Sequence, residues 1–161
     1  MSEKYTVTVV ERSEENIVGM KIATDMSHAA EDCPKLWHDV FGPRMCEVQC
    51  DGEARSYGAS FTTDIQTGRF DYWAAMPLRK DAPVPEGMEK AILPAGLYAE
   101  CPVDSIGALV ESYGYIFTEW LPQNNEYQAD VNKPSYELYP ADHLETGRAI
   151  LYFPITRVSA Q

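Results

Sequence analysis

The stretch that decides the fold is DSIGALVESYGYIFTEWLP, residues 104–122. Its large apolar side chains recur every three or four residues, at Ile106, Leu109, Val110, Tyr113, Ile116, Phe117 and Trp120. This spacing is typical of an amphipathic α-helix that packs one face against a core. Asp104 is expected to be the N-cap, and Pro122 ends the pattern because the residue before a proline avoids helical geometry. The sequence therefore predicts one long helix between these two residues.

Extended segments surround this helix. Two strands are expected before it, at Met88–Leu93 and Leu97–Cys101, and two after it, at Pro134–Tyr139 and Ala149–Ile155. The tripeptide Pro94–Gly96 suits a tight turn, because proline fixes φ and glycine allows a positive φ. The second half of the chain is thus predicted to run from strands through a helix to a strand pair.

The same order occurs in the first half of the chain. Strands are expected at Tyr5–Val10, Ile17–Ile22, Tyr57–Thr63 and Phe70–Met76. Between them, Ala30, Cys33, Trp37, Val40 and Phe41 lie at helical spacing. Trp37 and Trp120 fall on the apolar stripes of the two helices, and we interpret both as core residues. The segment Pro77–Gly87 contains three prolines and is expected to link the halves.

These patterns predict one α+β domain over residues 1–161. It should consist of two β-α-β-β units, as pseudo-repeats at approximately 5–77 and 88–157. Each unit alone has too little core to be stable, but together they can form one antiparallel sheet. We expect both helices on one face of this sheet and a ligand pocket on the other.

The composition narrows the range of functions. The chain has 161 residues, of which 45% are hydrophobic, enough for a globular domain. Its net charge of −12 would repel a phosphate backbone, so direct nucleic-acid binding is not expected. No segment approaches the ~20 apolar residues of a membrane span, and Met1–Tyr5 lacks the apolar core of a signal peptide. We therefore expect a cytoplasmic protein that binds no membrane.

Sequence motifs for catalysis, cofactors and metals are missing. The patterns GxSxG, HExxH, GxGxxG and a phosphate-binding Gly-Lys loop do not occur. Cys46 and Cys50 lie four residues apart, downstream of His38, but a single C-x-x-x-C pair is a weak metal signal. We expect free thiols, no metal and no cofactor.

One carboxylate stands out within the predicted strands. Glu137 lies in Ser135–Tyr139, a run that otherwise resembles a half-buried aromatic strand. A charge among buried aromatic residues is costly unless something pairs with it, and both carboxylates and aromatic rings attract cations. The hypothesis is a pocket for a flat or lipophilic cation. The alternative is that Glu137 faces water, because the polarity of a strand alternates.

An ordered set of short motifs runs along nearly the whole chain. The motifs are Ile17–Met20, Leu36-Trp37, Tyr57-Gly58, Phe70–Ala75, Leu93–Ala99, Trp120–Pro122, Tyr136–Tyr139 and Tyr152–Ile155. Taken together, they resemble the GyrI-like small-molecule-binding domain, which is also the effector-binding domain of AraC- and MerR-type bacterial transcription regulators. The resemblance implies duplicated β-α-β-β units around a pocket. In multidrug-binding members, a buried glutamate on a strand of the second-half hairpin holds cationic drugs, and Glu137 matches that position. The regulators carry a helix-turn-helix ahead of this domain, whereas here the domain begins at about Tyr5, so we expect a stand-alone binder.

Aromatic residues are expected to form the walls of this pocket. The predicted ligand-binding residues are Glu137, Trp73, Tyr139, Tyr57 and Tyr152. Trp73 and Tyr72 alternate on their strand, so we expect Trp73 to face the ligand and Tyr72 to pack under the helices. Tyr139 shares a strand face with Glu137. Plain core packing is the alternative for each aromatic residue.

Two other functions fit the same residues. In a small-molecule hydrolase, Glu137 could act as general base on a water, with a tyrosine hydroxyl as the acid. In an interaction or inhibitor module, the acidic surface would bind a larger protein, and Glu137 would hardly matter. A protein partner or a homodimer is compatible with either function.

Overall fold

The computed structural model describes residues 5–25, 27–50, 52, 55–64, 66–130 and 132–158. The strands are β1 (Thr8–Arg12), β2 (Glu15–Asp25), β3 (Arg55–Asp64), β4 (Arg69–Pro77), β5 (Glu89–Leu93), β6 (Gly96–Val103), β7 (Tyr127–Ala129), β8 (Ser135–Pro140) and β9 (Ala149–Arg157). The helical segments are α1 (Ala29–Lys35), η1 (Leu36–Phe41), η2 (Gly42–Glu47), α2 (Ile106–Tyr115), η3 (Ile116–Trp120), α3 (Leu121–Gln123) and α4 (His143–Thr146). None of the described helices is long and apolar enough to cross a membrane.

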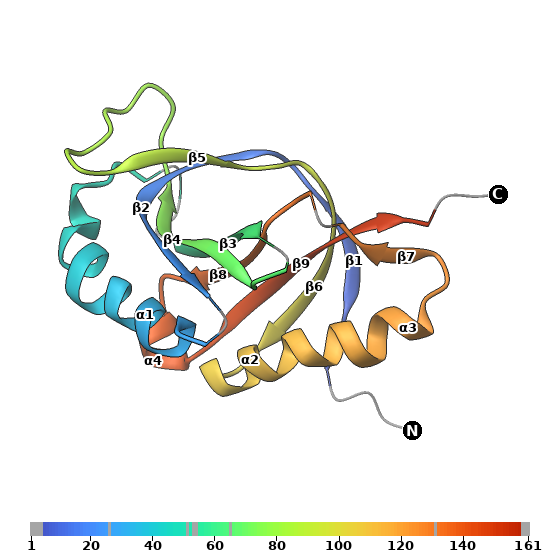
Figure 1. The fold of residues 1–161 in the computed structure, drawn as a ribbon. Coiled ribbons are helices and arrows are strands. Elements are labelled where there is room, and N and C mark those ends of the chain that lie inside the picture. Colours follow the sequence, from blue (N-terminus) through green and yellow to red (C-terminus); the bar gives the residue numbers. More distant parts are fainter. Residues whose placement is uncertain are drawn as a thin grey trace.

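The strands form one curled antiparallel sheet (Figure 1). Their order is β1-β6-β9-β8-β3-β4-β2-β5, and β7 pairs with the far end of β9. The centre of the sheet is the pair β3–β8, where Gly58 lies opposite Glu137. Each outermost strand pairs with a strand from the other half of the chain. Strand β1 of the first half pairs with β6 of the second, and β5 of the second half pairs with β2 of the first. The predicted α+β fold with an antiparallel sheet and two helices is confirmed.

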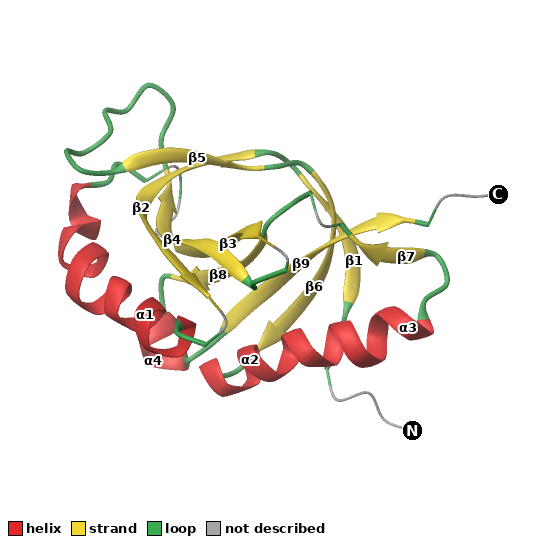
Figure 2. Ribbon diagram, in the orientation of Figure 1, coloured by secondary structure: helices red, strands yellow, loops and turns green. Residues whose placement is uncertain are grey.

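The two main helical segments lie on the same side of the sheet (Figure 2). The first segment consists of α1 and η1, and its Leu36 and Phe41 share an apolar cluster with Val18, Tyr72 and Ala74 of the sheet. The second consists of α2 and η3, and its Leu109 and Ile116 share another cluster with Cys101 and Leu151. In both segments the α-helix widens into a π-helix, at Leu36–Phe41 and at Ile116–Trp120. Such wide turns often occur near functional sites.

The N-cap of α2 differs from the prediction by one residue. The side chain of Ser105 accepts a hydrogen bond from the backbone N–H of Ala108, at 3.1 Å. The predicted cap, Asp104, lies one residue earlier. Both residue types cap helices well, so the sequence alone does not distinguish two neighbouring candidates.

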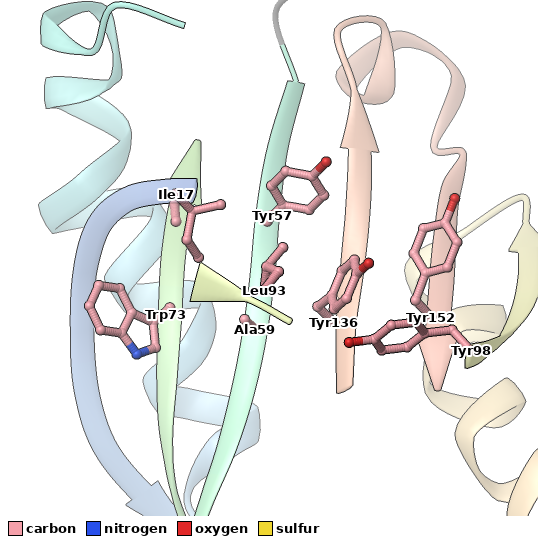
Figure 3. Close-up of a cluster of buried hydrophobic side chains, with 9 residues drawn as sticks. Ile17, Tyr57, Ala59, Trp73, Leu93, Tyr98, Tyr136 and Tyr152 are labelled. Carbon is pink, nitrogen blue, oxygen red and sulfur yellow. The ribbon is translucent and has the colours of Figure 1, made fainter. Parts of the chain in front are cut away.

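A separate apolar cluster fills the inside of the curl (Figure 3). It brings together residues from strands at both ends of the sheet, including Leu93 of β5 and Tyr98 of β6. Four tyrosines and one tryptophan dominate it: Tyr57, Trp73, Tyr98, Tyr136 and Tyr152. The sheet thus has two distinct buried faces, one under the helices and one inside the curl.

Candidate functional site

The carboxylate of Glu137 lies on the face of the sheet that the helices cover. Side chains alternate along β8, and Tyr136 belongs to the cluster inside the curl, so its neighbour Glu137 points to the opposite face. On that face, Tyr113 of the overlying helix α2 is a hydrogen-bond partner of Glu137. The side chain is almost completely buried, with 6% of its residue surface exposed. The structure thus contradicts the alternative of a Glu137 that faces water.

Two tyrosine hydroxyls donate hydrogen bonds to this carboxylate. Tyr113 donates to Oε2 at 2.5 Å, and Tyr139 donates to Oε1 at 2.7 Å. Tyr139 comes from the same strand two residues later, as the strand period predicts. The hydroxyls of Tyr139 and Tyr72 are themselves hydrogen-bonded, and Trp37 of η1 donates its ring N–H to Tyr72 at 2.8 Å. A connected polar network therefore joins both helical segments to Glu137.

Gly58, on the strand beside Glu137, leaves room for this network; we call the sheet surface at Gly58 the floor of the site. A Cβ atom on Gly58 would come within 2.8 Å of Oε1 of Glu137 and would overlap the hydroxyl of Tyr72. Strand β3 pairs with both β4 and β8, and Gly58 lies between Ala74 and Glu137. A side chain at this position would fill the space that the carboxylate and the tyrosine hydroxyl occupy.

Burial dominates the electrostatics of the site. It raises the pKa of Glu137 above its ordinary value, although the hydrogen bonds from Tyr113 and Tyr139 act in the opposite direction. Burial and the nearby Glu137 charge raise the pKa of both tyrosines well above their ordinary values. The same two causes raise the pKa of the Cys33 thiol on α1 to about 12, which leaves it protonated and weakly nucleophilic.

The carboxylate has no cationic partner within the described part of the chain. The ion pairs found there involve other residues, and Lys, Arg and His side chains do not pair with Glu137. Aromatic rings stand around it instead. The Trp37 and Tyr139 rings meet edge to face, with centroids 5.7 Å apart. The site is an anionic group enclosed by aromatic side chains and hydroxyl groups.

The opposite face, inside the curl, already contains cations of the protein. The guanidinium of Arg12 lies 4.2 Å from the centroid of the Tyr152 ring, and Arg55 lies 5.9 Å from that of Tyr57. Lys21 lies 5.6 Å from the centroid of the Trp73 ring. These three aromatic side chains are therefore engaged by positive charges from the chain itself.

The structure divides the predicted ligand-binding residues between these two faces. Glu137 and Tyr139 lie together under the helices, whereas Trp73, Tyr57 and Tyr152 lie inside the curl (Figure 3). The prediction placed the pocket on the face opposite to the helices, but Glu137 lies on the face that the helices cover. The physical reason is strand parity, because Glu137 and Trp73 occupy opposite-facing positions in the paired strands β8, β3 and β4.

Sequence reasoning missed several residues of the site. Tyr113 and Trp37 were interpreted only as parts of apolar helix stripes, and the role of Gly58 was not foreseen. Glycine in the middle of an aromatic strand is a usable signal, since it often marks a close approach of another group. For Tyr113 and Trp37, the polar atom on each ring was the available hint, because buried tyrosine and tryptophan need hydrogen-bond partners.

Two surface cavities lie away from Glu137. One of about 500 Å³ is lined by Glu14, Glu15, Asn16, Arg55, Leu78, Arg79, Lys80, Asp81, Ala82 and Lys90. The other, of about 330 Å³, is lined by Ala23, Thr24, Asp25, His28, Asp32, Thr63, Arg69 and Phe70. Among the residues that the structure describes, His, Cys, Asp and Glu form no group of three or more that could hold a metal.

Comparison with known proteins identifies relatives of this fold. The family described as Cass2, integron-associated effector binding protein, matches residues 8–155. The structure of SAV2435 bound to tetraphenylphosphonium superposes with a TM-score of 0.71 at 14% identity, covering 94% of each chain. An integron cassette protein from Vibrio cholerae gives a TM-score of 0.65 at 12% identity, covering 96% of this chain and all of that one. The C-terminal domain of EcmrR gives 0.69 at 13% identity, over 97% of this chain and 100% of that domain.

At these identities the structural likenesses show the fold, and the family match agrees with them. Sequence comparison with curated proteins gives no significant match. The resemblance to GyrI-like effector-binding domains that the sequence indicated is confirmed.

Proposed function

This chain belongs to the family of integron-associated effector-binding proteins, and we propose that it binds lipophilic, aromatic cations of drug-like size at Glu137. The observation that carries the proposal is the buried carboxylate itself. Glu137 lies between two helical segments with tyrosine hydroxyls as its hydrogen-bond donors and without an ion pair in the described residues. A bound cation would supply the missing positive charge.

The burial of Glu137 favours the binding of a positively charged ligand. A buried carboxylate is destabilised in its ionised form, and a cation at contact distance reverses that effect. Because Glu137 is buried, the attraction between the two charges is stronger than it would be at the surface. Binding and ionisation of Glu137 should therefore reinforce each other.

The aromatic side chains around Glu137 suit the apolar part of such a ligand. Trp37, Tyr72, Tyr113 and Tyr139 surround the carboxylate, and flat rings offer dispersion and cation–π contacts. Each well-placed ring contributes roughly 0.5–2 kcal/mol to the binding of a cation. Inside the curl, by contrast, a ligand cation would meet Arg12 and the other basic side chains already placed on the rings. The helix-covered face is therefore the favoured site.

A structural relative supports the class of ligand. SAV2435, which shares this fold, has been solved in complex with tetraphenylphosphonium, a lipophilic aromatic cation. The negative net charge of −12 favours the approach of cations to the present chain. For a ligand to reach Oε2 of Glu137, the hydroxyl of Tyr113 must move, because it donates a hydrogen bond to that oxygen.

The test is a titration with lipophilic cations and with neutral analogues of the same shape. Trp37 lies beside the site, so tryptophan fluorescence reports binding, and calorimetry gives the affinity. We expect the wild-type protein to bind the cations and Glu137→Gln to bind them at least tenfold more weakly, since removal of one partner of a buried charge pair typically costs roughly 3–5 kcal/mol.

Glu100→Gln is the matched control. Glu100 also accepts a hydrogen bond from a tyrosine hydroxyl, that of Tyr152 at 2.9 Å, but it belongs to the face inside the curl. This variant should keep the wild-type affinity for cations. Equal cation binding by wild type and Glu137→Gln would contradict the proposal. Conversion of a ligand to product that is lost in Glu137→Gln would instead indicate a hydrolase.

A further inference from the structure

The two tyrosines that donate to Glu137 are held with different firmness. Tyr139 is two residues away on the same strand, its hydroxyl is hydrogen-bonded to Tyr72, and its ring packs against Trp37. Tyr113 comes from α2, a separate element, and its other hydrogen-bond partner is Ser135 at 3.5 Å, the limit of such a bond. Of the two donors, Tyr113 is therefore the one that a ligand displaces.

Displacement of Tyr113 leaves Oε2 of Glu137 without a donor. A buried acceptor that loses its donor retains the full cost of its desolvation. A positive charge nearby offsets part of this cost but does not restore the directional hydrogen bond. A ligand that both carries the charge and donates a hydrogen bond satisfies the oxygen completely.

We propose that this site selects lipophilic ammonium ions that carry an N–H over fully substituted cations of the same size and charge. The N–H would donate to Oε2 in place of the Tyr113 hydroxyl, while Tyr139 continues to donate to Oε1. In a quaternary ammonium or phosphonium ion, carbon atoms surround the charged centre, so no such bond forms. This inference rests on the proposed function of the site and adds the class of ligand.

The selectivity should be measurable. A hydrogen bond to a charged group in a buried site corresponds to a preference of about tenfold to a hundredfold. Tetraphenylphosphonium, which carries no hydrogen on its charged centre, should accordingly be a weaker ligand of this chain than a protonated amine of similar apolar surface.

The experiment compares two isomeric cations by calorimetry. They are (2-naphthylmethyl)trimethylammonium and protonated N-ethyl-N-methyl-2-naphthylmethylamine, which have the same atoms and charge and differ in the N–H. Each is titrated at pH 7, where the amine is protonated, into the wild-type protein and into Glu137→Gln. We expect the N–H isomer to bind the wild type at least tenfold more tightly, and the preference to fall to about twofold or less in Glu137→Gln, whose neutral oxygen is a weaker acceptor.

The outcomes separate this inference from the proposed function. Equal affinity of the two isomers for the wild type, with loss of both in Glu137→Gln, would overturn the N–H preference and leave the cation site intact. A preference that persists unchanged in Glu137→Gln would also overturn it, because another residue would then be the acceptor. Failure of both isomers to bind the wild type would overturn the cation site and this inference with it.

Discussion

Substitution of Gly58 by alanine tests whether the floor of the site is packed as described. The added Cβ would lie 2.8 Å from Oε1 of Glu137, closer than real Cβ contacts allow, and 3.1 Å from Cζ of Tyr72, which is tighter than ordinary van der Waals contact. Glu137 is tied to Tyr113 and Tyr139, and Tyr72 is tied to Trp37, so relief of the overlap must break part of this network.

The expected cost follows from this geometry. Insertion of one methyl group into a closely packed core typically destabilises a protein by about 1–3 kcal/mol. Gly114 provides the matched control, since a Cβ there meets no atom within 4 Å and the residue lies in α2. Gly114→Ala should stabilise the protein by roughly 0.5–1 kcal/mol through helix propensity.

The assay is urea unfolding of the wild type and both alanine variants, followed by a cation titration of each. Gly58→Ala should lower the free energy of unfolding and weaken cation binding, whereas Gly114→Ala should do neither. If Gly58→Ala has wild-type stability and wild-type affinity, the carboxylate does not rest against this floor, and the description of the site is wrong.

Two further predictions concern the charges on the two faces. Because burial raises the folded-state pKa of Glu137, the folded protein keeps that proton as the pH rises through the unfolded-state value, and stability falls until the folded-state pKa is passed. The stability of Glu137→Gln relative to wild type should therefore increase from pH 4 upward, by about 1.4 kcal/mol for each pH unit that separates the unfolded-state pKa of Glu137 from its folded-state pKa. A difference between the two free energies of unfolding that stays constant with pH would contradict this. Inside the curl, Arg12 donates to Tyr136 and Tyr152, so Arg12→Met should destabilise the fold by roughly 1–3 kcal/mol. Cation affinity should remain unchanged in that variant, and a large gain of affinity would indicate that the ligand lies inside the curl, where Arg12 repels it.

Much of the fold was predictable because its elements carry strong periodic signals. The apolar spacing of residues 30–41 and 104–122 predicted the two main helices, and the alternation of apolar and polar residues predicted most of the strands. Short elements escaped, namely β7 and α4, since three or four residues carry too little pattern. The change to π-helix at Leu36 and Ile116 also escaped, because both stripes remain compatible with a regular α-helix.

The site was harder to predict than the fold. The sequence drew attention to Glu137 because a charge in an aromatic strand is unusual, and Tyr139 followed from the strand period. The face on which Glu137 lies is set by the pairing of β8 with β3 and by the packing of Tyr113 from α2 against it. Both involve residues far apart in the sequence, so local patterns do not predict them. Strand alternation gives the relative orientation of neighbours, but it does not reveal which face the helices cover.

The proposed function places a ligand cation under the helices, against Glu137. A crystal structure of the protein with the protonated naphthylmethylamine would show whether it lies there. We expect the ligand nitrogen within hydrogen-bond distance of Oε2 of Glu137, with the Tyr113 hydroxyl displaced and the naphthyl ring among Trp37, Tyr72 and Tyr139. Density for the ligand inside the curl, against Trp73 or Tyr57 and with the Tyr113–Glu137 bond intact, would contradict it.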